Sequence, residues 1–349
     1  MSTRPVVRAR ILALAVGLAA GGVLSVPTAP AQAGVFDSPQ LRTQVSFNAG
    51  GPGVCTGSPP GPAMVGPVPF AADGVPVTST GTFSRTYTNN GDAGDITKLD
   101  STMTSTVAVT GTPTSLTGIK FHSTSHSSVA STRGTAQQCG ASVTTISFAQ
   151  FTFDLAAPRA VVMHASGGGI VQVQFSRTVP SGPAEAVSLT LAGSGSGEGD
   201  AVKILSPGTW TASLAEQSQI AAPKPATPTT SISGDVSAEV SFTDPGVATG
   251  PATGDGNKFL KTADARTCAG SALTATWRAK AGTGQRRTVK KAVFLVNGIK
   301  AATVRKPKKG KVTTLTGLTA GKPADLEVRI TLAAKGAGTV TVERSYLIC

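Results

Sequence analysis

Apolar and polar residues alternate in short runs along most of the chain. A clear example is the segment S-P-G-T-W-T-A-S-L at residues 206–214. There a Pro-Gly turn is followed by Trp210, Ala212 and Leu214, which share one face of an extended strand. Beyond residue 33 no long stripe of apolar residues at helical spacing occurs, and Thr, Ser, Val, Ala and Gly dominate. Because β-branched residues favour strands and glycine favours turns, the pattern predicts an all-β protein.

The same alternation predicts strands in two groups. The first group lies at 43–48, 82–88, 102–110, 143–154, 160–164, 169–176, 186–192, 208–214 and 236–242. The second group lies at 273–278, 290–304, 311–318, 325–332 and 338–347. Asn297 and Gly298 divide the run 290–304 into a β-hairpin, because both residues tolerate the positive φ angles of a type I′ turn.

Composition divides the chain into parts. Residues 34–243 are expected to form a β-sandwich region, either as one domain or as two with a break near residue 142. Residues 244–257 are rich in Gly and Pro without hydrophobic periodicity, which indicates a linker between domains. Residues 258–349 are expected to form a second sandwich of about seven short strands.

Two stretches resemble known sandwich families. The spacing of Cys268 and Trp277, the V-N-G hairpin and the closing S-Y-L-I-C resemble immunoglobulin-like domains of bacterial extracellular proteins. The stretch 148–242, with F-x-F-D-L and V-x-V-x-F, is similar to jelly-roll sandwiches of secreted bacterial surface proteins, and the composition resembles that of actinobacterial ones. The resemblance implies an N-terminal jelly-roll-like β-sandwich and a C-terminal immunoglobulin-like β-sandwich. Tyr346 departs from the antibody pattern, since it precedes Cys349 by three residues rather than two. A bridge that ties the ends of the domain is therefore an alternative to a disulfide across its core.

The first 33 residues have the three parts of a cleavable secretory signal: a basic start, about sixteen apolar residues and an A-x-A site. Arg4, Arg8 and Arg10 supply the charge, and cleavage is expected after Ala33. The apolar stretch is shorter than the roughly 20 residues of a spanning helix. We expect an exported chain with no transmembrane segment after cleavage, either secreted or associated with the cell wall.

Four cysteines in an exported chain predict disulfide bonds. Of the three possible pairings we favour the local one, which joins Cys55 to Cys139 and Cys268 to Cys349 and places one bridge in each sandwich. Zinc is the competing use of cysteine, but no C-x-x-C pair occurs. The sequence therefore predicts neither a metal nor another cofactor.

Charge is unevenly distributed along the chain. Residues 34–256 hold 9 basic and 14 acidic residues, a net charge of −5, whereas residues 257–349 hold 19 basic and 4 acidic residues, a net charge of +15. The basic residues concentrate in Q-R-R-T-V-K-K and V-R-K-P-K-K-G-K, which flank the Asn297 hairpin and should meet at its open end. These candidate anion-binding residues are Arg286, Arg287, Lys290, Lys291, Arg305, Lys306, Lys308, Lys309 and Lys311.

Other candidate chemistry is sparse. His122 and His126 have an H-x-x-x-H spacing, but their neighbours favour a strand, on which four residues span about 13 Å, too far for one metal ion. His164 precedes a serine and a glycine run, which leaves a serine hydrolase as an alternative, although no G-x-S-x-G occurs. The segment N-N-G-D-A-G-D at 89–95 favours a tight Asx turn, with a Ca²⁺ site as the alternative. Residues 193–200 are expected to form a flexible glycine-rich loop.

Together these observations predict a non-enzymatic exported protein, for binding, adhesion or structure, whose basic C-terminal domain contacts anionic polymers. Outside a bacterial cell such polymers are acidic cell-wall polymers or acidic polysaccharides. A serine-type hydrolase and a Ca²⁺- or glycan-binding module are the alternatives. Sequence-specific binding of nucleic acid is not expected, because no recognition helix or aromatic stacking platform is visible. A solvated basic face that only aids solubility is the simplest competing interpretation.

Overall fold

The computed structural model describes residues 36–49, 54–59, 63–132, 139, 141–179, 183–222, 229–278, 289–333 and 338–349. Within these ranges every element is a β-strand apart from one 3₁₀ turn, η1 (Asp255–Lys258), so the predicted all-β class is confirmed. No helix in this part of the chain is long and apolar enough to cross a membrane. The proposed signal at 1–33 lies outside the described residues.

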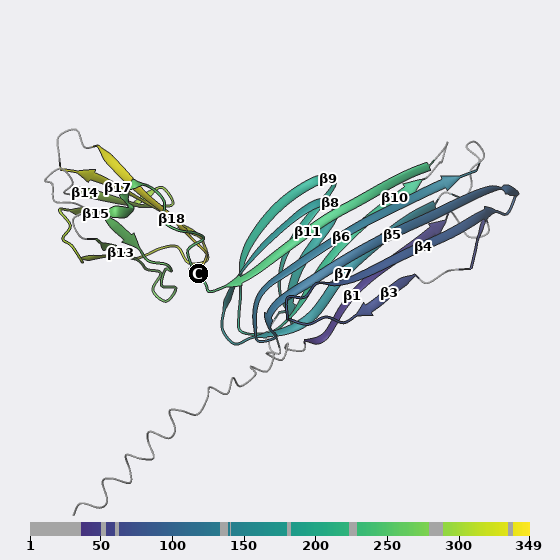
Figure 1. The fold of residues 1–349 in the computed structure, drawn as a ribbon, viewed down its shortest axis with the longest axis horizontal. Coiled ribbons are helices and arrows are strands. Elements are labelled where there is room, and N and C mark those ends of the chain that lie inside the picture. Colours follow the sequence, from purple (N-terminus) through teal and green to yellow (C-terminus); the bar gives the residue numbers. More distant parts are fainter. Residues whose placement is uncertain are drawn as a thin grey trace, which may run out of the picture. The chain divides into compact units, whose positions relative to one another are not determined.

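Eleven strands form one large antiparallel sheet, whose long members run side by side (Figure 1). They are β1 (Asp37–Ala49), β2 (Cys55–Gly57), β3 (Met64–Val68), β4 (Val77–Asn89), β5 (Asp92–Thr112), β6 (Ser115–Ser131), β7 (Ala141–Leu155), β8 (Arg159–Arg177), β9 (Glu185–Leu205), β10 (Gly208–Ala222) and β11 (Thr229–Thr243).

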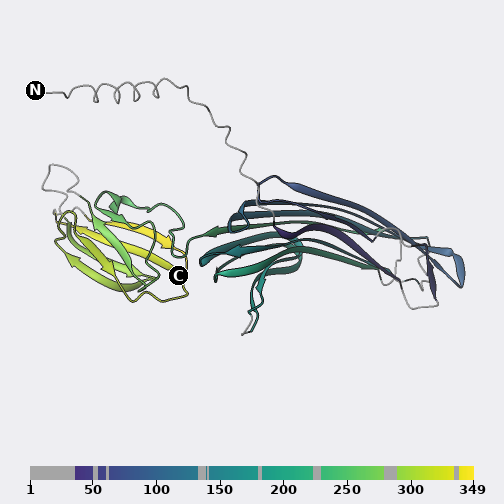
Figure 2. The ribbon, with the colours of Figure 1, turned by 90° about the horizontal axis from the view of Figure 1, so that it is seen from below.

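The large sheet curls into two layers (Figure 2). Its strand order is β2-β4-β5-β6-β11-β8-β10-β7-β1-β3, with β9 added beside β8. The passage from one layer to the other occurs along β8, since its residues 160–168 pair with β11 and its residues 170–176 pair with β10. Strands β5 and β6 consequently lie against β7. The predicted sandwich region is thus one continuous sheet, which passes through residue 142 in β7 without a break.

Between the layers, two apolar clusters are separated by a band of small polar side chains. On β6, for example, this band lies between Phe121 of one cluster and Val129 of the other. We call the band the hydroxyl belt, and all of its members are 5% exposed or less. It consists of Thr43, Ser79, Ser101, Ser105, Ser123, Ser125, Ser127, Thr145, Ser147 and Ser218.

Hydrogen bonds between belt hydroxyls connect the two layers. Ser105 Oγ of β5 bonds to Ser147 Oγ of β7, and Ser125 Oγ of β6 lies 3.0 Å from Ser218 Oγ of β10. Such bonds satisfy polar groups that would otherwise be buried without partners. The belt therefore joins the layers through polar contacts, whereas the apolar clusters on either side join them through hydrocarbon packing.

Two glycine-rich segments, one predicted as a loop and one left between predicted strands, lie inside strands, so the loop prediction for 193–200 is wrong. Residues 193–200 belong to β9, and the glycines at 167–169 merge the two predicted strands around them into the single strand β8. Gly167 has a φ of 134°, and a Cβ there would overlap the carbonyl oxygen of Asp235 on β11. Glycine is required at this close approach, next to the point where the register between β8 and β9 shifts.

The strand β6 has no counterpart among the predicted strands. Its inward positions at 123, 125 and 127 are serines of the hydroxyl belt, so the segment is buried on one side without showing apolar periodicity. The extended conformation expected for the segment around His122 and His126 is confirmed, because both residues lie on this strand.

The C-terminal residues form two smaller sheets, with strand orders β12-β13-β16 and β15-β14-β17-β18. Trp277 packs edge-on against Phe294 from the other sheet, with ring centroids 6.2 Å apart, so the two sheets enclose one apolar core. The strands are β12 (Leu260–Thr262), β13 (Leu273–Trp277), β14 (Val289–Val296), β15 (Ile299–Arg305), β16 (Val312–Leu315), β17 (Ala324–Leu332) and β18 (Thr339–Tyr346). We call this part the C-terminal sandwich.

Residues 244–257, predicted as a linker, fold instead with the C-terminal strands. Ala248 forms a β-bridge with Tyr346, and Thr253 forms one with Glu343. These contacts are made by the backbone, so they leave no apolar alternation in the sequence. The Gly- and Pro-rich composition therefore led to the prediction of a linker, although the segment is extended and belongs to the C-terminal sandwich.

Both favoured disulfides are present. Cys55 is bonded to Cys139 with Cα atoms 5.8 Å apart, and Cys268 is bonded to Cys349 with Cα atoms 5.2 Å apart. Cys268 is exposed in the turn before β13, and Cys349 follows the end of β18. The second bridge therefore ties the end of the segment after β18 to the turn between β12 and β13.

Candidate functional site

Basic side chains gather at the open end of the β14–β15 hairpin. The two strands pair so that Lys291 lies opposite Arg305, and the backbone N–H of Lys306 donates to the carbonyl of Lys290 at 3.1 Å. The two basic stretches of the sequence thus meet as predicted. We call their described members the basic cluster: Lys290, Lys291, Arg305, Lys306, Lys308, Lys309 and Lys311. The other two candidates, Arg286 and Arg287, lie outside the described residues.

A tight turn joins the two strands at the opposite end of the hairpin, and between that turn and the basic end the register shifts by one residue, at Phe294 and Leu295. Asn297 and Gly298 have φ angles of 50° and 75°, the positive values that a type I′ turn requires. Asn297 Oδ1 also accepts the backbone N–H of Asp325 at 2.7 Å, which anchors the turn to β17. The turn makes β14 and β15 antiparallel neighbours, and with the register shift Lys291 lies opposite Arg305.

The last three lysines of the basic cluster lie between β15 and β16. The N–H of Gly310 donates to the carbonyl of Trp277 at 2.8 Å, and the N–H of Trp277 donates to the carbonyl of Lys311 at 3.0 Å. This turn therefore lies beside the end of β13, where the exposed Arg278 follows Trp277. Sequence reasoning missed Arg278, because the pairing of β13 with β16 that brings it close cannot be seen in local alternation.

The positive charge of the basic cluster is not neutralised by the described part of the chain. All seven side chains are exposed, and none of them forms an ion pair with a described carboxylate. In the same sandwich, Glu327 pairs with Arg329 and Asp264 pairs with Arg344 instead. Several like charges held close together create a local positive potential that attracts anions.

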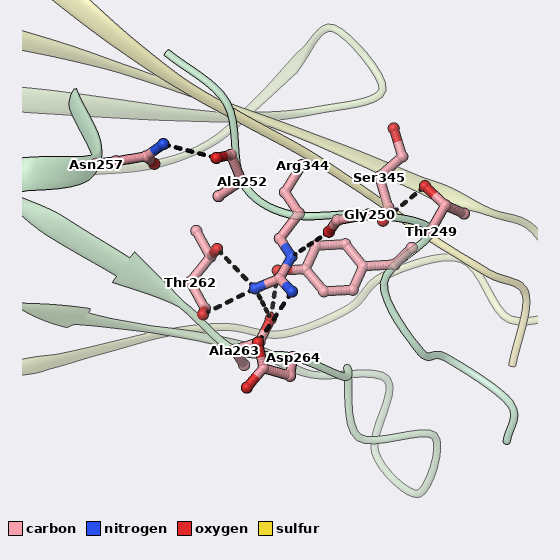
Figure 3. Close-up of polar contacts among 10 residues, drawn as sticks. Thr249, Gly250, Ala252, Asn257, Thr262, Ala263, Asp264, Arg344 and Ser345 are labelled. Atoms are coloured by element: carbon pink, nitrogen blue, oxygen red, sulfur yellow. Dashed lines mark hydrogen bonds and ion pairs between the residues drawn. The ribbon is translucent and has the colours of Figure 1, made fainter. Parts of the chain in front are cut away.

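A pocket of about 250 Å³ in the same sandwich is lined by Arg344. The guanidinium is engaged on all three of its nitrogens (Figure 3). Nε donates to the carbonyl of Gly250 at 3.1 Å, Nη1 donates to the carbonyls of Thr262 and Ala263, and Nη2 contacts Asp264 Oδ1 at 2.9 Å. These bonds fasten two separate segments, at Gly250 and at 262–264, to β18, which indicates a structural role for Arg344.

The three histidines lie on the outer face of the large sheet. His122 Nε2 is 2.9 Å from Asp235 Oδ1, and His126 Nδ1 is 2.9 Å from Ser233 Oγ. Each of these two imidazoles thus has its own partner on β11. Across the described ranges, no group of three or more His, Cys, Asp or Glu side chains is arranged to hold a metal ion.

His164 has part of the arrangement of a catalytic triad. Its Nδ1 lies 2.8 Å from Asp200 Oδ1, and its Nε2 lies 3.8 Å from Glu198 Oε1. The hydrogen bond with Asp200 raises the pKa of His164 above its ordinary value. In a Ser-His-Asp hydrolase the other ring nitrogen accepts the hydroxyl of the nucleophilic serine. Among the described residues no serine makes that bond.

A fluorophosphonate probe for active serines is expected to leave the protein unlabelled. The reason is that Nε2 of His164 lies 3.8 Å from Glu198 Oε1, and no serine of the described ranges bonds to it as a nucleophile would. Intact-mass spectrometry after incubation at neutral pH measures the labelling. Covalent labelling of Ser166 that disappears in a His164→Ala variant would contradict this expectation and favour the hydrolase.

The turn at residues 89–95 uses its side-chain oxygens locally. Asn89 Oδ1 accepts the N–H of Gly91 at 2.9 Å, and Asp92 Oδ1 accepts the N–H of Gly94 at 3.0 Å. These are the bonds of Asx turns, which the sequence favoured here. Binding of Ca²⁺ at this turn stays a prediction.

Comparisons with known proteins add no family. No family model and no curated protein matches the chain. Among solved structures, the chain is similar to a beta-glucuronidase from an uncultured Clostridium sp., with 8% sequence identity and a TM-score of 0.18. That alignment covers 57% of this chain and 34% of the other, so the chain spans about a third of that protein. At this TM-score the likeness carries no argument about activity.

Proposed function

We propose that this protein is a non-enzymatic binding protein of the cell exterior, and that the basic cluster attaches it to anionic polymers such as acidic cell-wall polymers or acidic polysaccharides. The observation that carries the proposal is the gathering, at one end of a hairpin, of seven exposed cations that pair with no carboxylate in the described ranges. A polymer with repeated negative charges can contact several of these cations at once, and salt screens such an attraction.

A purely solubilising role explains the position of these charges less well. Solubility is best served by charges of both signs that are interspersed over a surface. Here the 19 basic residues of 257–349 face only 4 acidic ones, and the β14–β15 register collects the excess in one place. Concentrated charge of one sign costs self-repulsion, which a bound polyanion relieves.

The chemistry of the cations indicates what kind of selectivity to expect. Six of the seven members of the basic cluster are lysines. A lysine ammonium acts as a mobile point charge, whereas arginine forms directed pairs of bonds with one anion. We therefore expect the cluster to select polymers by their charge density rather than by the identity of one sugar or base.

Export belongs to the same proposal. It is supported by the signal-like first 33 residues and by the two disulfides, because disulfides persist in oxidising compartments outside the cytoplasm. The resemblance to secreted bacterial surface proteins agrees with this location and supplies no further detail.

Replacing Lys306, Lys308, Lys309 and Lys311 together by glutamine is expected to weaken binding of a phosphodiester-bearing wall polymer about 30-fold. Each exposed ion pair contributes about 0.5 kcal/mol, so four of them contribute about 2 kcal/mol, which corresponds to that factor. Isothermal titration calorimetry at low salt measures the dissociation constants, with neutral dextran as the blank.

The matched control is the quadruple glutamine variant of Lys258, Lys261, Lys300 and Lys322. These lysines are exposed in the same sandwich but outside the basic cluster, so the control removes the same charge from the same fold. It is expected to bind within about twofold of the wild type, a difference of less than ~0.5 kcal/mol. Equal losses in the two variants would mean that net charge alone matters and would overturn the proposed site.

A further inference from the structure

Glu216 is a carboxylic acid buried between the two layers of the large sheet. It lies on β10 opposite Ser147 of β7 and Val171 of β8, and its exposure is 0%. Its side chain reaches across to the other layer, where Ser125 Oγ donates to Oε1 at 3.0 Å and Ser123 Oγ donates to Oε2 at 3.3 Å. Among the described residues, Glu216 is thus the one ionisable group that lies within the hydroxyl belt.

No cation among the described residues balances this carboxyl group. The strands packed against it present Ser147, Val171 and the two belt serines, and on β11 a Cβ at Gly234 would lie only 3.0 Å from Oε1. The titratable side chains of the facing strands β6 and β11, among them His122 and Asp235, alternate onto the outer surface. Ionised, Glu216 would be a buried charge stabilised by hydroxyl groups alone.

Burial raises the pKa of Glu216 to about 7, although hydrogen bonds from Ser125, Ser123 and Ser218 act in the opposite direction. Removing an ionised carboxylate from water is costly unless a cation accompanies it. The folded protein therefore holds the proton on Glu216 across the mildly acidic range, whereas the unfolded chain releases it near the ordinary value of 4.5.

The surroundings of Glu216 favour a local response to ionisation. On either side of the hydroxyl belt the layers are joined by apolar clusters, whose exposure to water is unfavourable. Within the belt, water would meet hydroxyl groups, which it can hydrogen-bond in place of their present partners. Opening at the belt therefore requires less free energy than opening either cluster.

We propose that Glu216 is a proton-operated latch: when protonated it holds the two layers together, and when ionised it lets the hydroxyl belt open and take up water while the flanking apolar clusters stay closed. The sign follows from linkage. The folded state binds the proton more tightly than the open state. The backbone amides at the hydroxyl belt are therefore fully protected from hydrogen exchange below pH 4.5, and they lose this protection as the pH rises to about 7.

Hydrogen exchange followed by mass spectrometry tests the latch. In the full wild-type chain, after correction for intrinsic rates, peptides covering β6 and β10 at the belt should lose protection roughly tenfold per pH unit between pH 5 and 7, up to about 300-fold in all. In Glu216→Gln the same peptides should show protection that does not change with pH. Glu239→Gln, an exposed glutamate on β11, is the control and should behave like the wild type.

Two results would overturn the proposal. One is an equal pH dependence in the wild type and in Glu216→Gln, because only the difference between the two proteins reports on Glu216. The other is an equal loss of protection in the apolar clusters, which would mean global rather than local opening. If Glu216→Gln does not fold, ¹³C labelling of the six glutamates in the wild type decides. A carboxyl titration of Glu216 centred near 7 supports the latch, and one near 4.5 contradicts it.

Discussion

Replacing Cys268 and Cys349 by serine is expected to lower the free energy of unfolding of the C-terminal sandwich by about 4 kcal/mol. The bridge closes a loop with a sequence separation of 81 residues, and a cross-link over such a loop strongly restricts the unfolded chain. It also holds the last residues in place, where the N–H of Gly246 donates to the carbonyl of Ile348 at 2.8 Å. Urea unfolding followed through the fluorescence of Trp277 measures the change.

Reduction of the wild type provides the control for this variant. Dithiothreitol should lower the unfolding midpoint of the wild-type C-terminal sandwich to the midpoint of the double serine variant. It should not change the midpoint of the C-terminal sandwich in the variant. A midpoint that is the same with and without the bridge would contradict the prediction, and would mean that the paired strands alone fix the ends of the sandwich.

Arg344→Ala is expected to destabilise the C-terminal sandwich by about 3 kcal/mol. The side chain of Arg344 is only 12% exposed, and its removal takes away the guanidinium bonds to the carbonyl groups of Gly250, Thr262 and Ala263, although Ala263 keeps its bond from Tyr346 Oη. Hydrogen bonds from a charged donor contribute about 1.5–3 kcal/mol each, so the loss of several of them has a large effect on stability. Arg344→Lys should lower the free energy of unfolding by more than half as much as Arg344→Ala, since lysine cannot reproduce the planar fork of donors.

The partner carboxylate separates the two contributions of this arginine. Asp264 has a side chain that is 79% exposed, so its ion pair with Arg344 is screened by water. Asp264→Asn should therefore change the free energy of unfolding by less than about 1 kcal/mol. If Asp264→Asn costs as much as Arg344→Ala in the same urea experiment, the ion pair and not the carbonyl bonds stabilises this corner.

Local alternation predicted the strand at 208–214 correctly because its inward face is apolar. Trp210, Ala212 and Leu214 show this, since all three are buried on β10. The prediction stopped at Leu214 because the next inward residues, Glu216 and Ser218, are polar although they continue the same face. A search for apolar alternation therefore does not detect the hydroxyl belt. For the same reason it missed β6 and the part of β10 beyond Leu214.

The basic cluster was predictable because one strong local signal controls it. The Asn297-Gly298 turn makes β14 and β15 an antiparallel hairpin, and the hairpin brings the described ends of both basic stretches together, although the register shifts by one residue at Phe294 and Leu295. Contacts between residues distant in sequence had no such signal. Arg278 joins the cluster through β13 and β16, and Arg344 meets Gly250 across 94 positions of sequence. Both depend on tertiary packing that a single sequence does not display.

The salt dependence of polymer binding tests the central claim most directly. For a phosphodiester-bearing wall polymer, the logarithm of the wild-type association constant should fall linearly with the logarithm of salt concentration. Each cation that contacts the polymer adds about one to the slope. The glutamine variant of Lys306, Lys308, Lys309 and Lys311 should therefore have a slope smaller by about four. Binding that does not respond to salt, or an unchanged slope in the variant, would contradict attachment through the basic cluster.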